Sequence, residues 1–315
     1  MRIAVIGAGG FVGKALTARL RRDGESVVPI VRRPAGVEGE RPIEDLGAAD
    51  WPALLSGCDG AVLAAARVHV MNETAVDPLA EFRRVNLEGS LAVMRGAIAA
   101  GVCRLVFIST VKVNGEETVL GAPFTADQAP RPSTPYGISK HEAEQALRAL
   151  AAEAEIELAI IRPTLVYGPD VRANFEAMMR WVARGMPLPL GGIERNRRSL
   201  VGIDNLVDLI AACLRSPAAA GQTFMASDGD DLSTTRLLRE VGRALDRPAR
   251  LVPVPAGLLD LAAGVIGKGE AIRRLTGSLQ VDIAKNRDVL GWTPPVSVPD
   301  GLARTAAAFL QGRAR

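Results

Sequence analysis

The chain begins MRIAVIGAGGFVGKALTARL over residues 1–20, and this stretch determines the type of fold. The apolar run over Ile3–Ile6 has the length and composition of a buried strand. Glycines follow at positions 7, 9, 10 and 13, and a helical pattern of apolar residues begins among them. A strand that passes through glycines directly into a helix predicts a tight turn, because glycine adopts positive φ angles that other residues avoid.

Three of these glycines, Gly7, Gly10 and Gly13, follow the pattern G-x-x-G-x-x-G. Val12 stands where the stricter G-x-G-x-x-G pattern needs its last glycine. Without a Cβ atom, the N–H groups of such a turn can approach a pyrophosphate, which the positive end of the new helix attracts. We therefore predict a dinucleotide site at these glycines, with Phe11 and Val12 beside them.

Strand and helix patterns alternate through the first half of the chain. The predicted strands are Ile3–Ile6, Ser26–Val31, Gly60–Ala64, Arg104–Ile108 and Glu157–Ile161. The predicted helices are Gly10–Arg22, Ala75–Ala100 and Tyr136–Glu155. This alternation predicts an α/β fold with a doubly wound, Rossmann-like parallel sheet.

The pattern changes after Arg162, where prolines cluster and the elements become shorter. We predict a smaller, mostly helical C-terminal substrate lobe formed by residues 166–198 and 227–315. Residues 1–165 are predicted to form the dinucleotide-binding core, and residues 199–226 to return to it. Two further strand–helix pairs are predicted in this half: Ser199–Ile203 with Asp204–Arg215, and Gln222–Met225 with Thr234–Leu245.

Composition narrows the class of protein. Of the 315 residues 48% are hydrophobic and 23% charged, with a net charge of +3, and no block of like charge indicates nucleic-acid binding. No uncharged apolar run reaches the roughly 18 residues of a membrane span, and no signal peptide precedes the first strand. Cys58, Cys103 and Cys213 lie far apart, which favours a reducing, cytoplasmic compartment. With two histidines and no clustered acidic residues, we expect no metal site.

The end of the second predicted strand bears on the choice of cofactor. An acidic residue at this place usually holds the adenosine ribose of NAD, but here Val31 is followed by Arg32 and Arg33. Arginine pairs well with a 2′-phosphate, so we favour NADP(H) over NAD(H); the alternative is a solvated strand end. Asp45 and Leu46, after the next loop, are expected to flank the adenine.

A pair of residues with catalytic chemistry stands in PSTPYGISKHEAEQAL. Tyr136 and Lys140 are four residues apart in a helical pattern, which places both side chains on one face of the helix. A nearby ammonium favours the phenolate and lowers the pKa of a tyrosine from about 10. Tyr136 is therefore a candidate general acid or base at a carbinol or carbonyl oxygen; the alternative is an ordinary surface pair.

Two hydroxyl residues end the strand in LVFISTVKVNGEE. Ligands of doubly wound sheets bind at the carboxyl ends of strands. Ser109 and Thr110 are thus candidates to hold a substrate oxygen against the tyrosine, unless they only satisfy the local backbone.

Together these features resemble the extended short-chain dehydrogenase/reductase family, which contains nucleotide-sugar epimerases, dehydratases and reductases. The resemblance covers nearly the whole chain and includes VNLEG at 85–89, RPTLVYGP at 162–169, RSLVGIDNLVD at 198–208 and DIAKNRDVLGWTPP at 282–295. It implies that Tyr136 is the acid/base, that Lys140 binds the nicotinamide ribose, and that Thr110, rather than Ser109, is the catalytic hydroxyl. It also implies a structural role for Asn86.

The resemblance extends to the binding of cofactor and substrate. Ala64, Ala65, Ala66 and Pro163 are expected to line the dinucleotide site. In ANFEAMMRWVARGMPLPL, residues 173–190, the resemblance implies that Asn174 meets a diphosphate or sugar oxygen and that Pro189 and Leu190 lie near the base. Arg198 matches an arginine that grips the diphosphate. The long helices over 75–100 and 136–155 imply a homodimer.

The sequence departs from the family where Asn114-Gly115 replaces the usual Tyr-Gly. The stretches KVNGEET and PFTADQAP resemble a subgroup in surface-polysaccharide biosynthesis that acts on UDP-N-acetylhexosamines and their 4-keto-6-deoxy derivatives. The favoured prediction is an NADPH-dependent 4-keto reductase of a UDP-hexose or UDP-N-acetylhexosamine. The alternatives are a UDP-sugar 4-epimerase with tightly bound NAD and, less favoured, an inactive cofactor-sensing protein.

Overall fold

Seven parallel strands form the main sheet, in the order β3-β2-β1-β4-β5-β6-β9. The computed structural model describes residues 1–68, 77–255, 257–258 and 269–314. The strands are β1 (Arg2–Ile6), β2 (Ser26–Val31), β3 (Arg41–Pro42), β4 (Gly60–Leu63), β5 (Arg104–Ile108), β6 (Glu157–Pro163) and β9 (Thr223–Ala226). The predicted Rossmann-like sheet is confirmed. The sequence does not predict β3, because a strand of two residues leaves no recognisable pattern.

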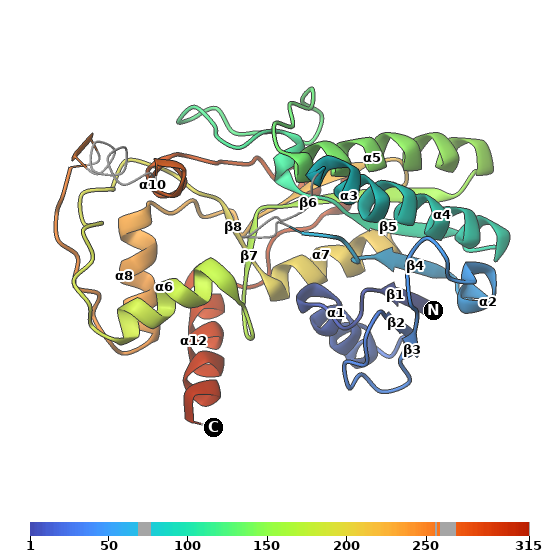
Figure 1. Ribbon diagram of the computed structural model, residues 1–315, viewed down its shortest axis with the longest axis horizontal. Coiled ribbons are helices and arrows are strands. Elements are labelled where there is room, and N and C mark those ends of the chain that lie inside the picture. Colours follow the sequence, from blue (N-terminus) through green and yellow to red (C-terminus); the bar gives the residue numbers. More distant parts are fainter. Residues whose placement is uncertain (69–76, 256, 259–268, 315) are drawn as a thin grey trace.

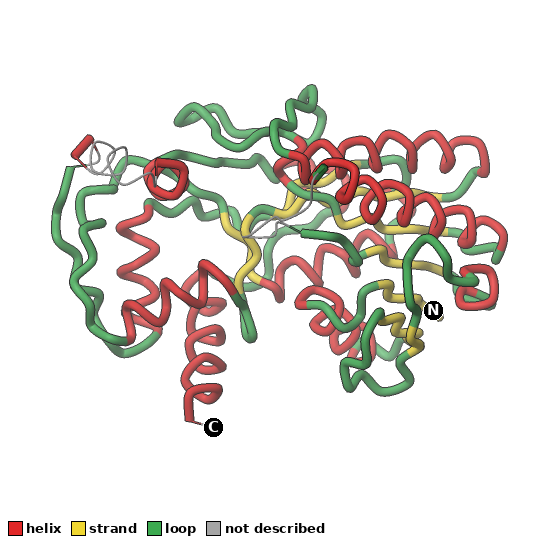
Figure 2. The backbone as a smooth tube through the Cα atoms, in the orientation of Figure 1, coloured by secondary structure: helices red, strands yellow, loops and turns green. Residues whose placement is uncertain are grey.

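Helices cover both faces of the sheet (Figures 1 and 2). One face packs on α1 (Phe11–Arg22) and α7 (Ile203–Arg215), and the other on α2 (Trp51–Leu55), α4 (Gly89–Ala99) and α5 (Pro135–Ala154). Alternate residues of β1 face opposite sides of the sheet, which explains its continuous apolar sequence. Ile3 and Val5 pack on the side of α1 and α7, and Ala4 and Ile6 pack on the side of α2, α4 and α5. A strand buried on both faces has no polar side to alternate with.

The helix predicted over Ala75–Ala100 is wrong as a single regular helix. The described part consists of α3 (Pro78–Arg83), a π-helical turn η1 (Arg84–Glu88) and α4, and the predicted start at Ala75 lies outside the described residues. Asn86 lies at the centre of this π turn, and its amide group bonds the backbone of Arg67 through both N–H and C=O. The surplus residue of a π turn is typical of functional positions.

The C-terminal half supplies a second, mostly helical body beside the carboxyl ends of the strands (Figure 1). Its helices are α6 (Ala173–Ala183), α8 (Thr234–Ala244), α10 (Gly269–Thr276) and α12 (Val298–Ala314). The short strands β7 (Leu165–Tyr167) and β8 (Leu200–Gly202) pair with each other in a separate sheet. The segments η2 (Val111–Val113), η3 (Pro217–Ala219) and α11 (Ala284–Leu290) complete the described elements. The helical C-terminal region that the sequence predicts is present.

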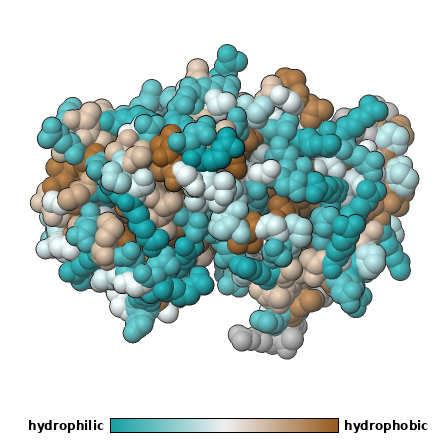
Figure 3. Space-filling model, turned by 180° about the vertical axis from the view of Figure 1, so that it is seen from behind, coloured by the Kyte–Doolittle hydropathy of each residue, from teal (hydrophilic) through white to brown (hydrophobic). Residues whose placement is uncertain are grey.

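Seen from behind, hydrophobic residues form separate small areas within a mainly hydrophilic face (Figure 3). No helix in the described ranges has the length and apolar character needed to cross a bilayer.

Candidate active site

The glycine turn between β1 and α1 has no room for side chains. Gly7 has a φ of +93°, and a Cβ atom there would lie 2.7 Å from the backbone nitrogen of Ala65, in the loop after β4. At Gly13 a Cβ atom would lie 2.1 Å from the carbonyl oxygen of Gly7. The helix therefore starts directly against the strand end, and its first N–H groups, capped by no side chain at Gly10, are left for a ligand such as a phosphate.

Substitution of Gly13 by alanine is expected to abolish dinucleotide binding and to destabilise the protein by about 2–4 kcal/mol. The added methyl would overlap backbone that has no alternative position, so the turn must open. Nucleotide affinity by calorimetry and melting temperature are the measurements. Gly312→Ala is the control, because nothing lies within 4 Å of a Cβ atom there; equal behaviour of the two variants would contradict this account.

The residues predicted to hold the adenosine end lie around the same turn. The loop after β2 touches it, since a Cβ atom at Gly9 would lie 2.9 Å from Cβ of Ala35. Arg32 and Arg33 are exposed at the start of this loop. The loop itself is held by Glu40, whose carboxylate accepts from the backbone N–H groups of Ala35 and Val37.

Asp45 and Leu46 lie on the α4 side of the sheet. Asp45 pairs with Arg84 of η1 at 3.1 Å, and Leu46 packs on Gly89 at the start of α4. The loop of Ala64, Ala65 and Ala66 continues from β4, where the N–H of Ala64 donates to the carbonyl of Ile6. Pro163 ends β6 in register with Ala226 of β9. These predicted cofactor contacts therefore follow the carboxyl ends of β1, β2, β3, β4 and β6 in the same sheet.

Tyr136, Lys140 and Thr110 meet where α5 begins beside the end of β5. The Tyr136 phenol lies close enough to the Thr110 hydroxyl for the hydroxyl to lower its pKa, and its ring lies 5.9 Å from that of Phe82 on α3. Lys140, one turn further along, is fully buried with Nζ 3.8 Å from the centroid of the Phe107 ring. The phenol of Tyr136 and the hydroxyl of Thr110 can thus serve one reacting oxygen.

Burial changes the acidity of both residues of the pair. It raises the pKa of Tyr136 to about 12, and the hydrogen bond with Thr110 opposes the rise. It lowers the pKa of Lys140 to about 7, and the nearby carboxylate of Glu144 opposes the fall. The sequence predicts a lowered pKa for Tyr136, but in the protein without ligand this pKa is raised. The reason is desolvation, which also removes part of the lysine charge that would stabilise a phenolate.

The ammonium group of Lys140 has no hydrogen-bond partner among the described residues. A buried donor without an acceptor is costly, so Nζ marks a place for a ligand rich in oxygen, such as a ribose. This orphaned donor and the glycine turn, which a Cβ atom would fill, together fit a bound dinucleotide.

Ser109 faces away from this group. Its hydroxyl donates to Oε1 of Glu144 at 2.5 Å, in a buried cluster with Arg162. Neither Glu144 nor Arg162 attracts notice as a site residue in the sequence. The only available signal is that Glu144 falls on the same helix face as Tyr136 and Lys140, four residues further along.

The predicted substrate residues are spread over the second body. Asn174 is exposed in the first turn of α6. Pro189 is exposed, whereas the Leu190 side chain is buried in the C-terminal core and its carbonyl accepts from Thr235. Arg198 is half-buried, with Nη1 3.3 Å from the carbonyl of Gly277.

No group of three or more His, Cys, Asp or Glu side chains is arranged for a metal ion in the described ranges. The chemistry that the side chains at this site could supply is proton transfer by Tyr136, with Thr110 and Lys140 as candidate hydrogen-bond donors.

Comparison with known proteins agrees with this arrangement. The family model described as "NAD dependent epimerase/dehydratase family" matches residues 3–226. A UDP-glucose 4-epimerase of Vibrio cholerae is 43% identical over 317 residues, which cover 99% of this chain and 97% of that protein. Among solved structures, MoeE5 with UDP-glucuronic acid and NAD has a TM-score of 0.80 at 23% identity, covering 99% of this chain and 100% of that one. The UDP-glucose 4-epimerase of Thermotoga maritima has a TM-score of 0.79 at 22% identity, covering 99% and 100%.

Proposed function

Because the chain belongs to the NAD-dependent epimerase/dehydratase family, we propose that it is a UDP-hexose 4-epimerase that carries NAD. The 43% identity over nearly the whole length of a UDP-glucose 4-epimerase supports this choice above the 4-keto reductase. The preference for NADP(H) that the sequence suggests has no such support.

The residues around Tyr136 carry out the acid–base part of this reaction. Tyr136 takes the proton of the C4 hydroxyl and returns it after the sugar has presented its other face, while the Thr110 hydroxyl holds the C4 oxygen. Lys140 donates to the nicotinamide ribose and, once its charge is restored there, favours the phenolate. The bound nicotinamide supplies the redox chemistry at C4.

The nucleotide part of the substrate binds against the C-terminal body. Asn174, Pro189, Leu190 and Arg198 are its candidate contacts, and Arg198 suits a diphosphate because guanidinium binds such groups in bidentate fashion. Residues 1–165 with 199–226 serve the dinucleotide, and 166–198 with 227–315 the sugar nucleotide. Pairing of α4 and α5 between two copies would give a homodimer, and the free cysteines favour a cytoplasmic location.

Proton NMR of UDP-glucose with the purified protein, without added cofactor, is the decisive experiment. We expect the anomeric signal of UDP-galactose, the C4 epimer, to appear until equilibrium is reached. UDP-N-acetylglucosamine is the second substrate to follow. If neither sugar is epimerised, with or without added NAD, the proposal is overturned.

The 4-keto reductase remains a second candidate because of Arg32 and Arg33, two exposed cations beside the glycine turn. The nucleotide released on denaturing the purified protein separates the two candidates by mass. NAD supports the epimerase. NADP, together with oxidation of NADPH by a UDP-4-keto-6-deoxyhexose, supports the reductase.

A further inference from the structure

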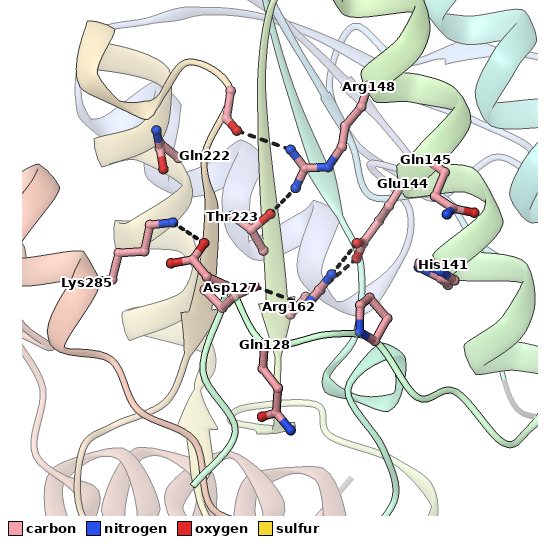
Figure 4. A pocket seen from close by; sticks show the side chains of 13 residues that line it. Asp127, Gln128, His141, Glu144, Gln145, Arg148, Arg162, Gln222, Thr223 and Lys285 are labelled. Atoms are coloured by element: carbon pink, nitrogen blue, oxygen red, sulfur yellow. Dashed lines mark hydrogen bonds and ion pairs between the residues drawn. The ribbon is translucent and has the colours of Figure 1, made fainter.

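A buried ion pair lies behind the candidate catalytic residues, at a pocket of about 340 Å³ between α5, β6 and β9 (Figure 4). Arg162 of β6 donates from Nε and Nη2 to the two carboxylate oxygens of Glu144 of α5, at 2.9 and 2.6 Å. The two side chains are 4% and 2% exposed. Because desolvation cancels much of the attraction in such a pair, net stability is a weak reason for its presence.

Both partners reach the segment that contains Thr110. Glu144 accepts from Ser109, the residue before it, at 2.5 Å. Arg162 donates from Nη1 to Oδ1 of Asn114, four residues after it, at 3.0 Å. The pair therefore fixes the chain on both sides of Thr110, whose hydroxyl oxygen accepts from the N–H of Lys112 at 3.3 Å and lies beside the Tyr136 phenol.

Glu144 also stands one helical turn after Lys140 on the buried face of α5. Other charges around α5 are paired or exposed: Arg83 of α3 pairs with Glu142, Lys112 of η2 pairs with Glu116, and Arg84, Glu88 and Arg95 are exposed. Arg148, one turn beyond Glu144 on α5, also interacts with the Glu144 carboxylate. The Phe107 ring lies against the Lys140 ammonium, the Glu144 carboxylate interacts with it, and Arg162 of β6 lies beyond Glu144. In this part of the chain Glu144 is the carboxylate that acts on Lys140.

We propose that Glu144 is a positioning residue, which fixes Thr110 through Ser109 and holds a carboxylate beside the Lys140 ammonium. The kinetic part of this proposal rests on the proposed function, whereas the effect on Lys140 does not. Glu144 reaches neither substrate nor dinucleotide and acts only through these two neighbours.

Titration of Lys140 tests the electrostatic half without any substrate. The chain has only five lysines, so ¹³C labels at lysine Cε give five NMR signals, and that of Lys140 is assigned by its absence in Lys140→Met. In Glu144→Gln we expect the Lys140 midpoint to fall by about one pH unit, since a carboxylate is lost and Arg162 is left unpaired. Ser109→Ala and the exposed Glu153→Gln on the same helix are expected to leave the midpoint in place.

Steady-state kinetics test the positioning half. Both Glu144→Gln and Ser109→Ala are expected to lower kcat by on the order of 10-fold to 100-fold at unchanged KM, and Glu153→Gln to change neither. If Glu144→Gln does not fold, Glu144→Asp replaces it; this variant keeps the charge but shortens the reach, so kcat falls while the Lys140 midpoint stays.

An unchanged Lys140 midpoint in folded Glu144→Gln would overturn the electrostatic role. A raised KM with unchanged kcat in Ser109→Ala would make Ser109 a substrate contact and overturn the positioning role. Wild-type protein that epimerises no UDP-sugar would remove the proposed function, and the Lys140 titration would still decide whether Glu144 acts on Lys140.

Discussion

Replacement of Tyr136 by phenylalanine is expected to lower kcat by about 10²–10⁴-fold, the range for loss of a general acid–base group. The phenol is the group that the structure places against Thr110 at the end of β5. Phenylalanine keeps the ring packed on Phe82 but has no proton to transfer. Nucleotide binding and melting temperature are expected to remain as in the wild type. NMR of the epimerisation reaction measures kcat, and calorimetry measures NAD binding.

The second tyrosine of the chain provides the matched control. Tyr167 is buried and donates to Asp228 at 2.8 Å; it lies on β7 of the two-stranded sheet, whereas Tyr136 lies on α5. Tyr167→Phe leaves the buried Asp228 with one donor fewer, which costs about 1–3 kcal/mol of stability, and is expected to spare kcat. Full activity of Tyr136→Phe would remove Tyr136 from the mechanism and favour a protein that only binds the dinucleotide.

Replacement of Lys140 by methionine is expected to abolish turnover and at the same time to stabilise the nucleotide-free protein. Burial lowers the pKa of Lys140 from 10.5 to about 7, so between these values the unfolded chain binds more protons than the folded one. The cost of burying this lysine is absent above about pH 10.5, grows as the pH falls, and is complete below about pH 7. Linkage puts it at up to about 4 kcal/mol at pH 7.

Denaturant unfolding of both proteins at several pH values measures this effect. The stability advantage of Lys140→Met is expected to be greatest near pH 7 and to shrink towards pH 10. Lys14→Met, at an exposed position of α1, is the control and is expected to show no such trend. An advantage that does not vary with pH would mean that packing, and not charge, is responsible.

Local patterns in the sequence predict the parts of the site that lie within one turn or one helix. Gly7, Gly10 and Gly13 act within a single strand–turn–helix unit, and Tyr136 and Lys140 within one helical turn, so their spacing is visible in the sequence. The fold follows in the same way, because each strand buried on both faces is a continuous apolar run.

Contacts between distant segments are not visible in this way. Glu144 and Arg162 are 18 residues apart, and Ser109 lies 35 residues before Glu144; no periodicity connects them. Their meeting depends on β5 and β6 lying side by side under α5. The same contacts explain a departure from the family pattern: Asn114, where a tyrosine is usual, turns inward to accept from Arg162.

The substrate side is the least predictable part for the same reason. Leu190 looks like a candidate contact in the sequence, yet its side chain fills the C-terminal core. In that body short elements from residues 165–202 and 232–306 pack together, so the exposure of each side chain is decided by segments far away in the sequence.

The π turn between α3 and α4 limits how the length of this chain can vary in evolution. A helix advances by about 100° per residue, so deletion of any one residue from Arg84–Glu88 would restore a regular helix and rotate all of α3 against α4. Phe82 would then leave the ring of Tyr136, and Arg83 would leave Glu142. Relatives that share Tyr136 should keep the length of this turn and its buried Asn86, which bonds the Arg67 backbone and Ser139, while the exposed Arg84 and Glu88 vary.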